Sequence, residues 1–134
     1  MPHSLHRDLM RDDDAPASAR RELEPFRSEL DPLVYQDVAL LITELVTNSV
    51  RHAGPEAGDR VLFDLAVTPG RVRVDVRDGG PGFTPVPRDP GNTSPYHWGL
   101  HIVERLADRW AVVPPNGTAG TLVWFEVDRL PAAG

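Results

Sequence analysis

The sequence predicts an α+β fold in which helices pack on one face of a mostly antiparallel sheet. Apolar residues recur at helical spacing in three segments, 17–30, 37–54 and 98–108. Other segments alternate apolar and polar residues and are joined by short turns, which indicates two hairpins. Because hairpin sheets bury one face and the helices are few, a two-layer sandwich is the arrangement that satisfies both.

The composition indicates one globular domain. The chain has 134 residues, of which 40% are hydrophobic and 25% charged, and a formal net charge of −6. That charge argues against direct DNA binding, which usually needs a basic face. No apolar run approaches the ~20 residues that span a bilayer, and the N-terminus does not resemble a signal peptide. We therefore expect a cytoplasmic protein with no membrane association; the absence of cysteine excludes thiolate chemistry.

Three regions are expected along the chain. Residues 1–16 form an N-terminal tail in which SLHRDLM could be an edge strand, 17–128 form the domain, and 129–134 form a C-terminal tail. The first helix is expected over 17–30, with a kink or a later start because Pro25 interrupts it.

The central element is the helix predicted over residues 37–54, DVALLITELVTNSVRHAG. It carries Glu44, Asn48 and His52 at intervals of four, which places them along one side of a helix. Apolar residues occupy the neighbouring stripe, so an acid, an amide and an imidazole line the rim of the buried face. Such a position favours a cleft rather than a solvated surface.

The rest of the chain predicts strands and one long loop. Segments 60–67 and 71–78 form the first hairpin, and segments 109–114 and 121–127 form the second. Residues 79–97 contain five Pro and four Gly, and a connection of that length inside a domain is usually functional.

Four short patterns carry candidate chemistry. In chain order they are Glu44-x-x-x-Asn48-x-x-x-His52, Asp78-Gly79-Gly80-Pro81-Gly82, Gly99-Leu100 at a helix start, and Gly120-Thr121 before the last strand. Each alone has a structural explanation: Gly-rich runs make turns, Gly often marks a helix boundary, and His52 could be a cap. Their joint order, each at the matching kind of element, makes coincidence improbable.

The residue types indicate a nucleotide site. A carboxylate such as Glu44 can accept a proton, and the amide oxygen of Asn48 suits Mg²⁺. Asp78 at a strand end could bond the exocyclic amine of adenine, and amides at a helix start bind phosphate. All fourteen basic residues are Arg, so a P-loop, which needs Lys, is excluded.

This ordered set resembles the GHKL (Bergerat-fold) family of ATP-binding domains, which includes histidine kinases, gyrases, heat-shock chaperone ATPases and anti-sigma-factor kinases. The resemblance covers roughly residues 17–128. The segments ELVTNSVRHAG and RLADRWAV are most similar to the corresponding segments of small stand-alone actinobacterial relatives of anti-sigma-factor serine/threonine kinases.

The resemblance implies a role for each matching position, with ATP and Mg²⁺ as cofactors. Glu44 is the implied base and Asn48 the implied Mg²⁺ ligand. Asp78 would bond adenine, and residues 83–97 would form a lid. The other implied nucleotide contacts are Gly80 and Gly82, which shape the pocket, Gly99 and Leu100, which hold phosphates, and Thr121, which assists at adenine. The role of His52 stays open.

One position departs from the family pattern. Relatives usually have Gly two residues before Gly99, where this chain has His97. A side chain there could obstruct the approach of the backbone to the triphosphate, or His97 could itself contact phosphate.

The implied function is a protein serine/threonine kinase that phosphorylates an anti-anti-sigma-like protein and can sequester a sigma factor. The alternative is a nucleotide-sensing or partner-binding module with little or no catalysis. An ATPase fragment of the gyrase or chaperone kind is disfavoured because no transducer domain is recognisable. Only about sixteen residues precede the first helix, so a sensor histidine kinase is not expected. A homodimer is expected by resemblance.

Overall fold

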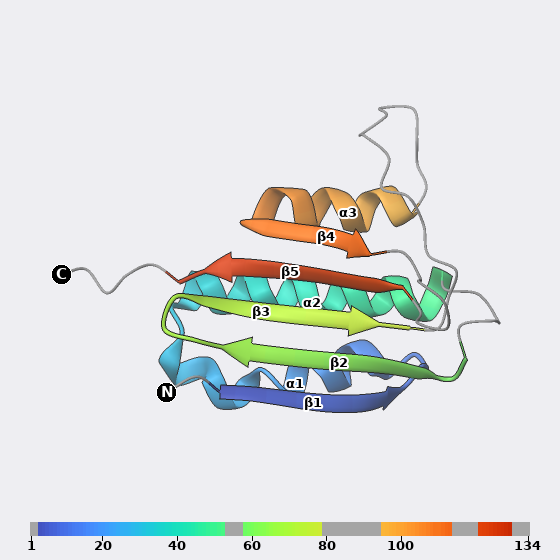
Figure 1. Ribbon diagram of the computed structural model, residues 1–134, viewed down its shortest axis with the longest axis horizontal. Helices are drawn as coiled ribbons and strands as arrows, with labels where there is room; N and C mark the ends of the chain where they lie inside the picture. Colours follow the sequence, from blue (N-terminus) through green and yellow to red (C-terminus); the bar gives the residue numbers. More distant parts are fainter. Residues whose placement is uncertain (1–2, 53–57, 79–94, 114–120, 130–134) are drawn as a thin grey trace.

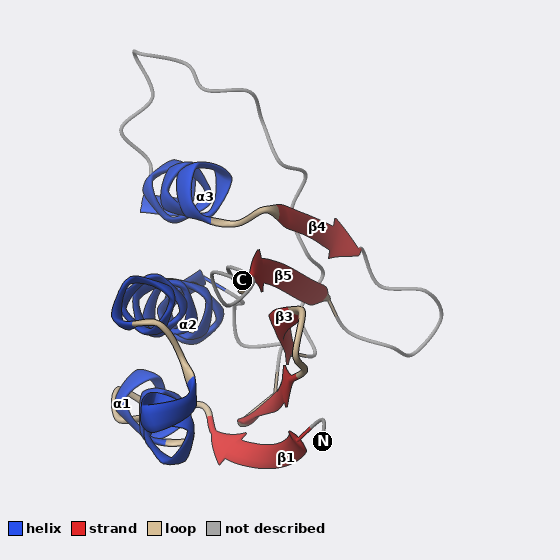
Figure 2. Cartoon of the chain, turned by 90° about the vertical axis from the view of Figure 1, so that its left-hand side faces the viewer, coloured by secondary structure: helices blue, strands red, loops and turns tan. Residues whose placement is uncertain are grey.

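The fold is a two-layer α+β sandwich, as the sequence predicts. The computed structural model describes residues 3–52, 58–78, 95–113 and 121–129, with the backbone alone for His52 and residues 95–100. Within these residues, a five-stranded antiparallel sheet has the strand order β1-β2-β3-β5-β4. The helices lie on one face of that sheet and leave its other face open (Figures 1 and 2).

The elements follow the predicted order. The strands are β1 (His3–Met10), β2 (Arg60–Val67), β3 (Arg71–Arg77), β4 (Arg109–Val113) and β5 (Leu122–Asp128). The helices are α1 (Ala15–Arg21), the 3₁₀ helix η1 (Glu24–Glu29), α2 (Pro32–His52) and α3 (Pro95–Leu106).

The expected edge strand in the N-terminal region is present as β1. It pairs with β2 along its whole length, with His3 opposite Val67 and Met10 opposite Arg60. Leu5 and Leu9 pack against the hydrophobic core. Residues 3–10 are therefore part of the sheet.

The first predicted helix is divided into two. α1 ends at Arg21, and Pro25 is the second residue of the 3₁₀ helix η1 instead of continuing the α-helix. Proline lacks the backbone N–H that an α-helix needs and clashes with the preceding turn. Leu23 and Phe26 remain buried on either side of the break, so the hydrophobic pattern that predicted one helix holds across both pieces.

All three α-helices begin earlier than expected: α1 begins at Ala15 instead of residue 17, and α2 and α3 both begin with proline. α2 starts at Pro32, where Asp31 accepts hydrogen bonds from the amides of Leu33 (2.8 Å, side chain) and Tyr35 (2.9 Å, backbone). α3 starts at Pro95, which corrects the expectation that 98 is its first residue and that the loop reaches 97. Proline is favoured at a first helical position because its missing N–H has no partner there anyway. Residues 79–94 lie outside the described residues.

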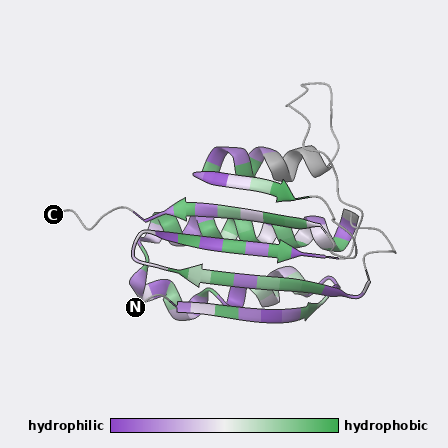
Figure 3. Cartoon of the chain, viewed as in Figure 1, coloured by the Kyte–Doolittle hydropathy of each residue, from purple (hydrophilic) through white to green (hydrophobic). Residues whose placement is uncertain are grey.

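The core lies between α2 and the sheet. α2 contributes Val38, Leu41, Ile42 and Val46, each with 0% exposure, and these cross β3 and β5. Along β3 the buried residues Val72, Val74 and Val76 alternate with charged residues, so hydrophobic and hydrophilic residues alternate in that strand (Figure 3). Burial of one such side chain contributes about 1.5–3 kcal/mol, so this face holds α2 in one position across the sheet.

A buried carboxylate organises the open face of the sheet. Glu126 on β5 is 7% exposed and accepts a hydrogen bond from Arg109 Nε at 2.7 Å. Arg71 and Arg73 on β3 each approach it to 3.5 Å. The Arg109 hydrogen bond holds the pKa of Glu126 below its usual value of 4.5, and the nearby arginine charges add to this effect. Glu126 thus joins three neighbouring strands.

We predict that Glu126→Gln lowers the free energy of unfolding at pH 7 by about 1–2 kcal/mol, because three arginines lose their shared carboxylate. Since the folded state lowers the pKa of Glu126, its stabilising effect is complete above the ordinary value of 4.5 and is lost as pH falls through the lowered pKa. Urea denaturation of both proteins between pH 7 and 3 measures this, and the two curves should converge in acid.

Asp75→Asn is the matched control. Asp75 pairs with Arg73 at 2.8 Å but is more exposed than Glu126, so its loss should cost under about 1 kcal/mol. An equal effect of the two substitutions, or a difference that persists in acid, would contradict the assignment.

Candidate functional site

The candidate site begins on the C-terminal half of α2. Glu44 and Asn48 are half-buried, one turn apart, beside the fully buried residues Leu41 and Val46. They therefore lie at the rim of the buried face, where helix geometry places them.

A hydrogen bond joins α2 to the end of β3. Ser49 Oγ donates to Asp78 Oδ2 at 2.8 Å, and Ser49 is 6% exposed. Asp78 follows the last residue of β3, so its half-buried carboxylate is held beside the last turns of α2. This hydrogen bond restricts the orientation of the Asp78 carboxylate.

Thr121 lies at the same place. The backbone N–H of Asp78 donates to the carbonyl of Thr121 at 3.0 Å, and Thr121 is 3% exposed. This bond extends the pairing of β3 with β5, in which Arg77 faces Leu122. The end of α2, the end of β3 and the start of β5 thus meet at one edge of the sandwich (Figure 1).

α3 packs against α2 on the side opposite to α1 (Figure 2). The two helices pack side by side, with Val103 of α3 fully buried (Figure 2). Since α3 begins at Pro95, Gly99 and Leu100 are in its second turn rather than at its first residue. The N–H groups without a helical partner belong to the first turn of a helix. Tyr96, His97 and Trp98 occupy that turn.

Some predicted site residues lie outside what the structure describes. Gly80 and Gly82 are outside the described residues, as are residues 83–94 of the expected lid. The side chains of His52, His97 and Leu100 are also outside them. The roles inferred for these residues stay predictions.

Ser49 is the site residue that the sequence motifs did not indicate. It lies four residues after Leu45 and three after Val46, within the apolar stripe of α2. A hydroxyl on the buried side of a helix needs a hydrogen-bond partner. A hydroxyl within the apolar stripe is therefore the sequence signal that could have indicated Ser49. The structure identifies its hydrogen-bond partner as Asp78.

Two other polar groups lie along the helices. Burial raises the pKa of Asp37 on α2 above its usual value, and the negative charge of Asp108, which lies between α3 and β4, adds to the increase. On α3, His101 Nδ1 is buried and has no hydrogen-bond partner in the structure as described. Neither group contacts the Ser49–Asp78 pair through any bond found among the described residues.

The residues that meet here fit an adenine nucleotide with Mg²⁺. Asp78 is a fixed hydrogen-bond acceptor at the edge of the sheet, and adenine presents an amine donor. Asn48 offers an amide oxygen, and Mg²⁺ typically takes few protein ligands together with phosphates and water. Among the described residues no cluster of three or more His, Cys, Asp or Glu could hold a metal.

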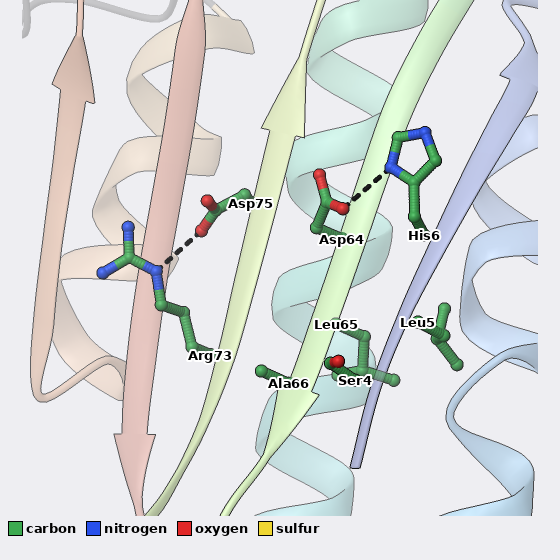
Figure 4. A pocket seen from close by; sticks show the side chains of 8 residues that line it. All are labelled: Ser4, Leu5, His6, Asp64, Leu65, Ala66, Arg73 and Asp75. Carbon is green, nitrogen blue, oxygen red and sulfur yellow. Dashed lines mark hydrogen bonds and ion pairs between the residues drawn. The ribbon is translucent and has the colours of Figure 1, made fainter. Parts of the chain in front are cut away.

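A shallow hollow on the open face of the sheet is separate from this site. Strands β1, β2 and β3 line it, and its charged side chains are already paired (Figure 4). His6 Nδ1 lies 2.8 Å from Asp64 Oδ1, and Arg73 Nε donates to Asp75 Oδ1 at 2.8 Å. The hollow contains none of the residues that the motifs indicated.

Comparison with known proteins identifies the family. The sequence model of the histidine kinase-like ATPase domain matches residues 11–126. The chain therefore belongs to the histidine kinase-like ATPase domain family, as the resemblance predicted.

Within the described residues, none of the helices combines the length and apolar character needed to cross a membrane.

The similar proteins include an anti-sigma factor. An anti-sigma F factor of Pasteuria penetrans is 31% identical over 115 residues, which cover 76% of this chain and 77% of that protein. A solved structure of the RsbU and RsbW domains of a Mycobacterium tuberculosis protein aligns with a TM-score of 0.71 and 24% identity. It covers 97% of this chain, which spans 34% of that longer one.

The fold also occurs in a histidine kinase. The histidine kinase domain of the blue-light activated kinase EL346 from Erythrobacter litoralis aligns with a TM-score of 0.55 and 21% identity. The alignment covers 84% of this chain and 64% of that one. At this identity the similarity establishes a shared fold.

We predict that Ser49→Ala lowers the free energy of unfolding by about 1–2 kcal/mol, because the half-buried carboxylate of Asp78 loses a hydrogen-bond donor. The amide resonance of Asp78 should shift in NMR spectra, since its side chain is no longer held. Ser28→Ala, at an exposed position of η1, is the control and should stay within about 0.5 kcal/mol of the wild type. Equal stability of Ser49→Ala and the wild type would argue against the hydrogen bond.

Proposed function

We propose that this protein binds Mg-ATP at the Ser49–Asp78 edge and transfers the γ-phosphoryl group to a serine or threonine hydroxyl. The proposed acceptor is an anti-anti-sigma-like protein, and the proposed second partner is a sigma factor. The convergence of Ser49, Asp78 and Thr121 beside Glu44 and Asn48 carries this proposal. Membership of the ATPase family and similarity to an anti-sigma F factor support the choice of nucleotide and partners.

The role proposed for each residue is the one that the family resemblance implies. Asp78, which accepts a hydrogen bond from Ser49, would accept another from the adenine amine. Asn48 provides an amide oxygen for Mg²⁺ one turn from Glu44. Mg-ATP supplies the phosphoryl group and the metal charge that stabilises its transfer.

Glu44 is the proposed general base. Its half-buried carboxylate lies farther from Asp78 along α2 than Asn48 does, toward the N-terminal end of the helix. A positioned carboxylate that accepts the proton of an attacking hydroxyl typically contributes a factor of about 10²–10⁴ in rate. The chain contains no Lys, so the proposed phosphate contacts are Arg side chains and backbone N–H groups at the start of α3, where His97 also lies.

The direct test is transfer of labelled γ-phosphate from Mg-ATP to anti-anti-sigma proteins encoded in the same genome. Mass spectrometry should locate the phosphate on a single serine or threonine of the acceptor. Binding of Mg-ATP without transfer to any such acceptor would favour the non-catalytic partner-binding module instead.

We predict that Glu44→Gln lowers the transfer rate at least about 100-fold and changes the affinity for Mg-ATP less than about three-fold. The amide keeps the shape of the side chain but is not a base. Asp37→Asn, an acid-to-amide change on the same helix, is the control and should leave transfer unaffected. Full activity of Glu44→Gln would exclude this carboxylate as the base.

A further inference from the structure

Arg11 connects the end of β1 to the end of α2. Its side-chain Nε donates to the carbonyl of Gly58 at 2.7 Å. One terminal nitrogen of the same guanidinium lies 3.4 Å from the carbonyl of Ser49 and 3.3 Å from that of Val50. The backbone N–H of Arg11 donates to the carbonyl of Asp59 at 2.7 Å. One residue thus contacts two segments that are distant in sequence.

The two carbonyls that Arg11 contacts lie near the C-terminal end of α2. α2 is described as far as His52, and Ser49 and Val50 belong to its last four residues. Carbonyls near the C-terminal end of a helix form the negative end of the helix dipole. A guanidinium placed there provides hydrogen bonds and a favourable charge together, so Arg11 acts as a side-chain cap of α2.

The conformation of Gly58 suits this arrangement. Its φ is +78°, in the left-handed region that residues with a side chain rarely adopt. That conformation turns the chain just before β2, where the carbonyl of Gly58 meets Arg11 Nε. Arg11 is therefore held from the β2 side while it contacts the helix end.

Ser49 links this cap to the candidate site. Its carbonyl faces Arg11, while its hydroxyl donates to Asp78 at 2.8 Å. Asp78 in turn donates its backbone N–H to Thr121. The contacts form a continuous chain from Arg11 through the last turns of α2 to the carboxylate proposed to bind adenine.

We propose that Arg11 is a positioning residue of the nucleotide site, which fixes the last turns of α2 so that Ser49 holds Asp78 in its binding orientation. This inference rests on the proposed nucleotide function. Arg11 does not contact the reacting groups, and it acts through Ser49. Loss of its guanidinium frees the helix end, so Ser49 and Asn48 no longer keep one place relative to Asp78.

The test compares Arg11→Gln with Arg7→Gln. Arg7 lies on β1, where it donates to Glu22 and to the carbonyl of His6 instead of to α2. The first measurement is hydrogen exchange of the nucleotide-free proteins. Amides of residues 45–52 should exchange about ten-fold faster in Arg11→Gln than in the wild type, and at the wild-type rate in Arg7→Gln.

The second measurement is calorimetry with Mg-ATP. Arg11→Gln should bind about ten-fold more weakly, as loss of a charge-assisted contact implies, and Arg7→Gln should match the wild type. Arg11→Lys keeps the charge but not the planar fork, so it should fall between them. It also provides a folded variant if Arg11→Gln does not fold.

The outcomes separate this inference from the proposed function. Wild-type affinity in Arg11→Gln, or an equal loss in Arg7→Gln, would overturn the positioning role. If the wild-type protein binds no Mg-ATP, the proposed function is overturned. Hydrogen exchange then still decides whether Arg11 holds the end of α2, and unchanged exchange in Arg11→Gln would refute that on its own.

Discussion

The packing of α2 across the sheet is the constraint on which the rest of the structure depends. Its fully buried residues Val38, Leu41, Ile42 and Val46 fix both the rotation of the helix and its position along the strands. Because the rotation of α2 is fixed, Glu44 and Asn48 lie at the rim of its buried face. Because the position of α2 along the strands is fixed, its last turns reach the end of β3, where Ser49 donates a hydrogen bond to Asp78. The hydrophobic core therefore determines the geometry of the polar site.

Polar interactions then fix the parts that apolar packing leaves loose. On the open face, Glu126 joins β3, β4 and β5 through its arginines, and Arg109 of β4 also pairs with Asp128. At the opposite end of α2 from Pro32, Arg11 contacts the carbonyls of Ser49 and Val50. In both places an arginine guanidinium binds several oxygen acceptors, in a chain whose basic residues are all Arg.

Much of the fold could be predicted from the sequence because periodicity reports burial. The alternating residues of β2 gave its bounds as 60–67, which the structure reproduces as Arg60–Val67. The helix boundaries were less accurate, because Pro25 divides one helix and Pro32 and Pro95 begin two others ahead of their apolar stripes. Local stereochemistry at proline, rather than hydrophobic pattern, decides those positions.

The candidate site was predictable in its motifs but not in its contacts. Glu44 and Asn48 are four residues apart, and helix geometry alone places them on the same side of α2. The pairing of Ser49 with Asp78, and of Arg11 with the end of α2, joins residues 29 and 38 positions apart. Contacts at such separations depend on how the layers stack, and a single sequence does not carry that information.

Selectivity between Mg-ATP and Mg-GTP tests the central claim most directly. Adenine presents an amine donor where guanine presents a carbonyl acceptor, so a fixed Asp78 carboxylate should accept the first and repel the second. Calorimetry of the wild-type protein should show ATP binding at least about 100-fold tighter than GTP, because a site built around one hydrogen bond rejects ligands that cannot form it. Equal affinities, or no binding of either nucleotide at millimolar concentration, would contradict the account.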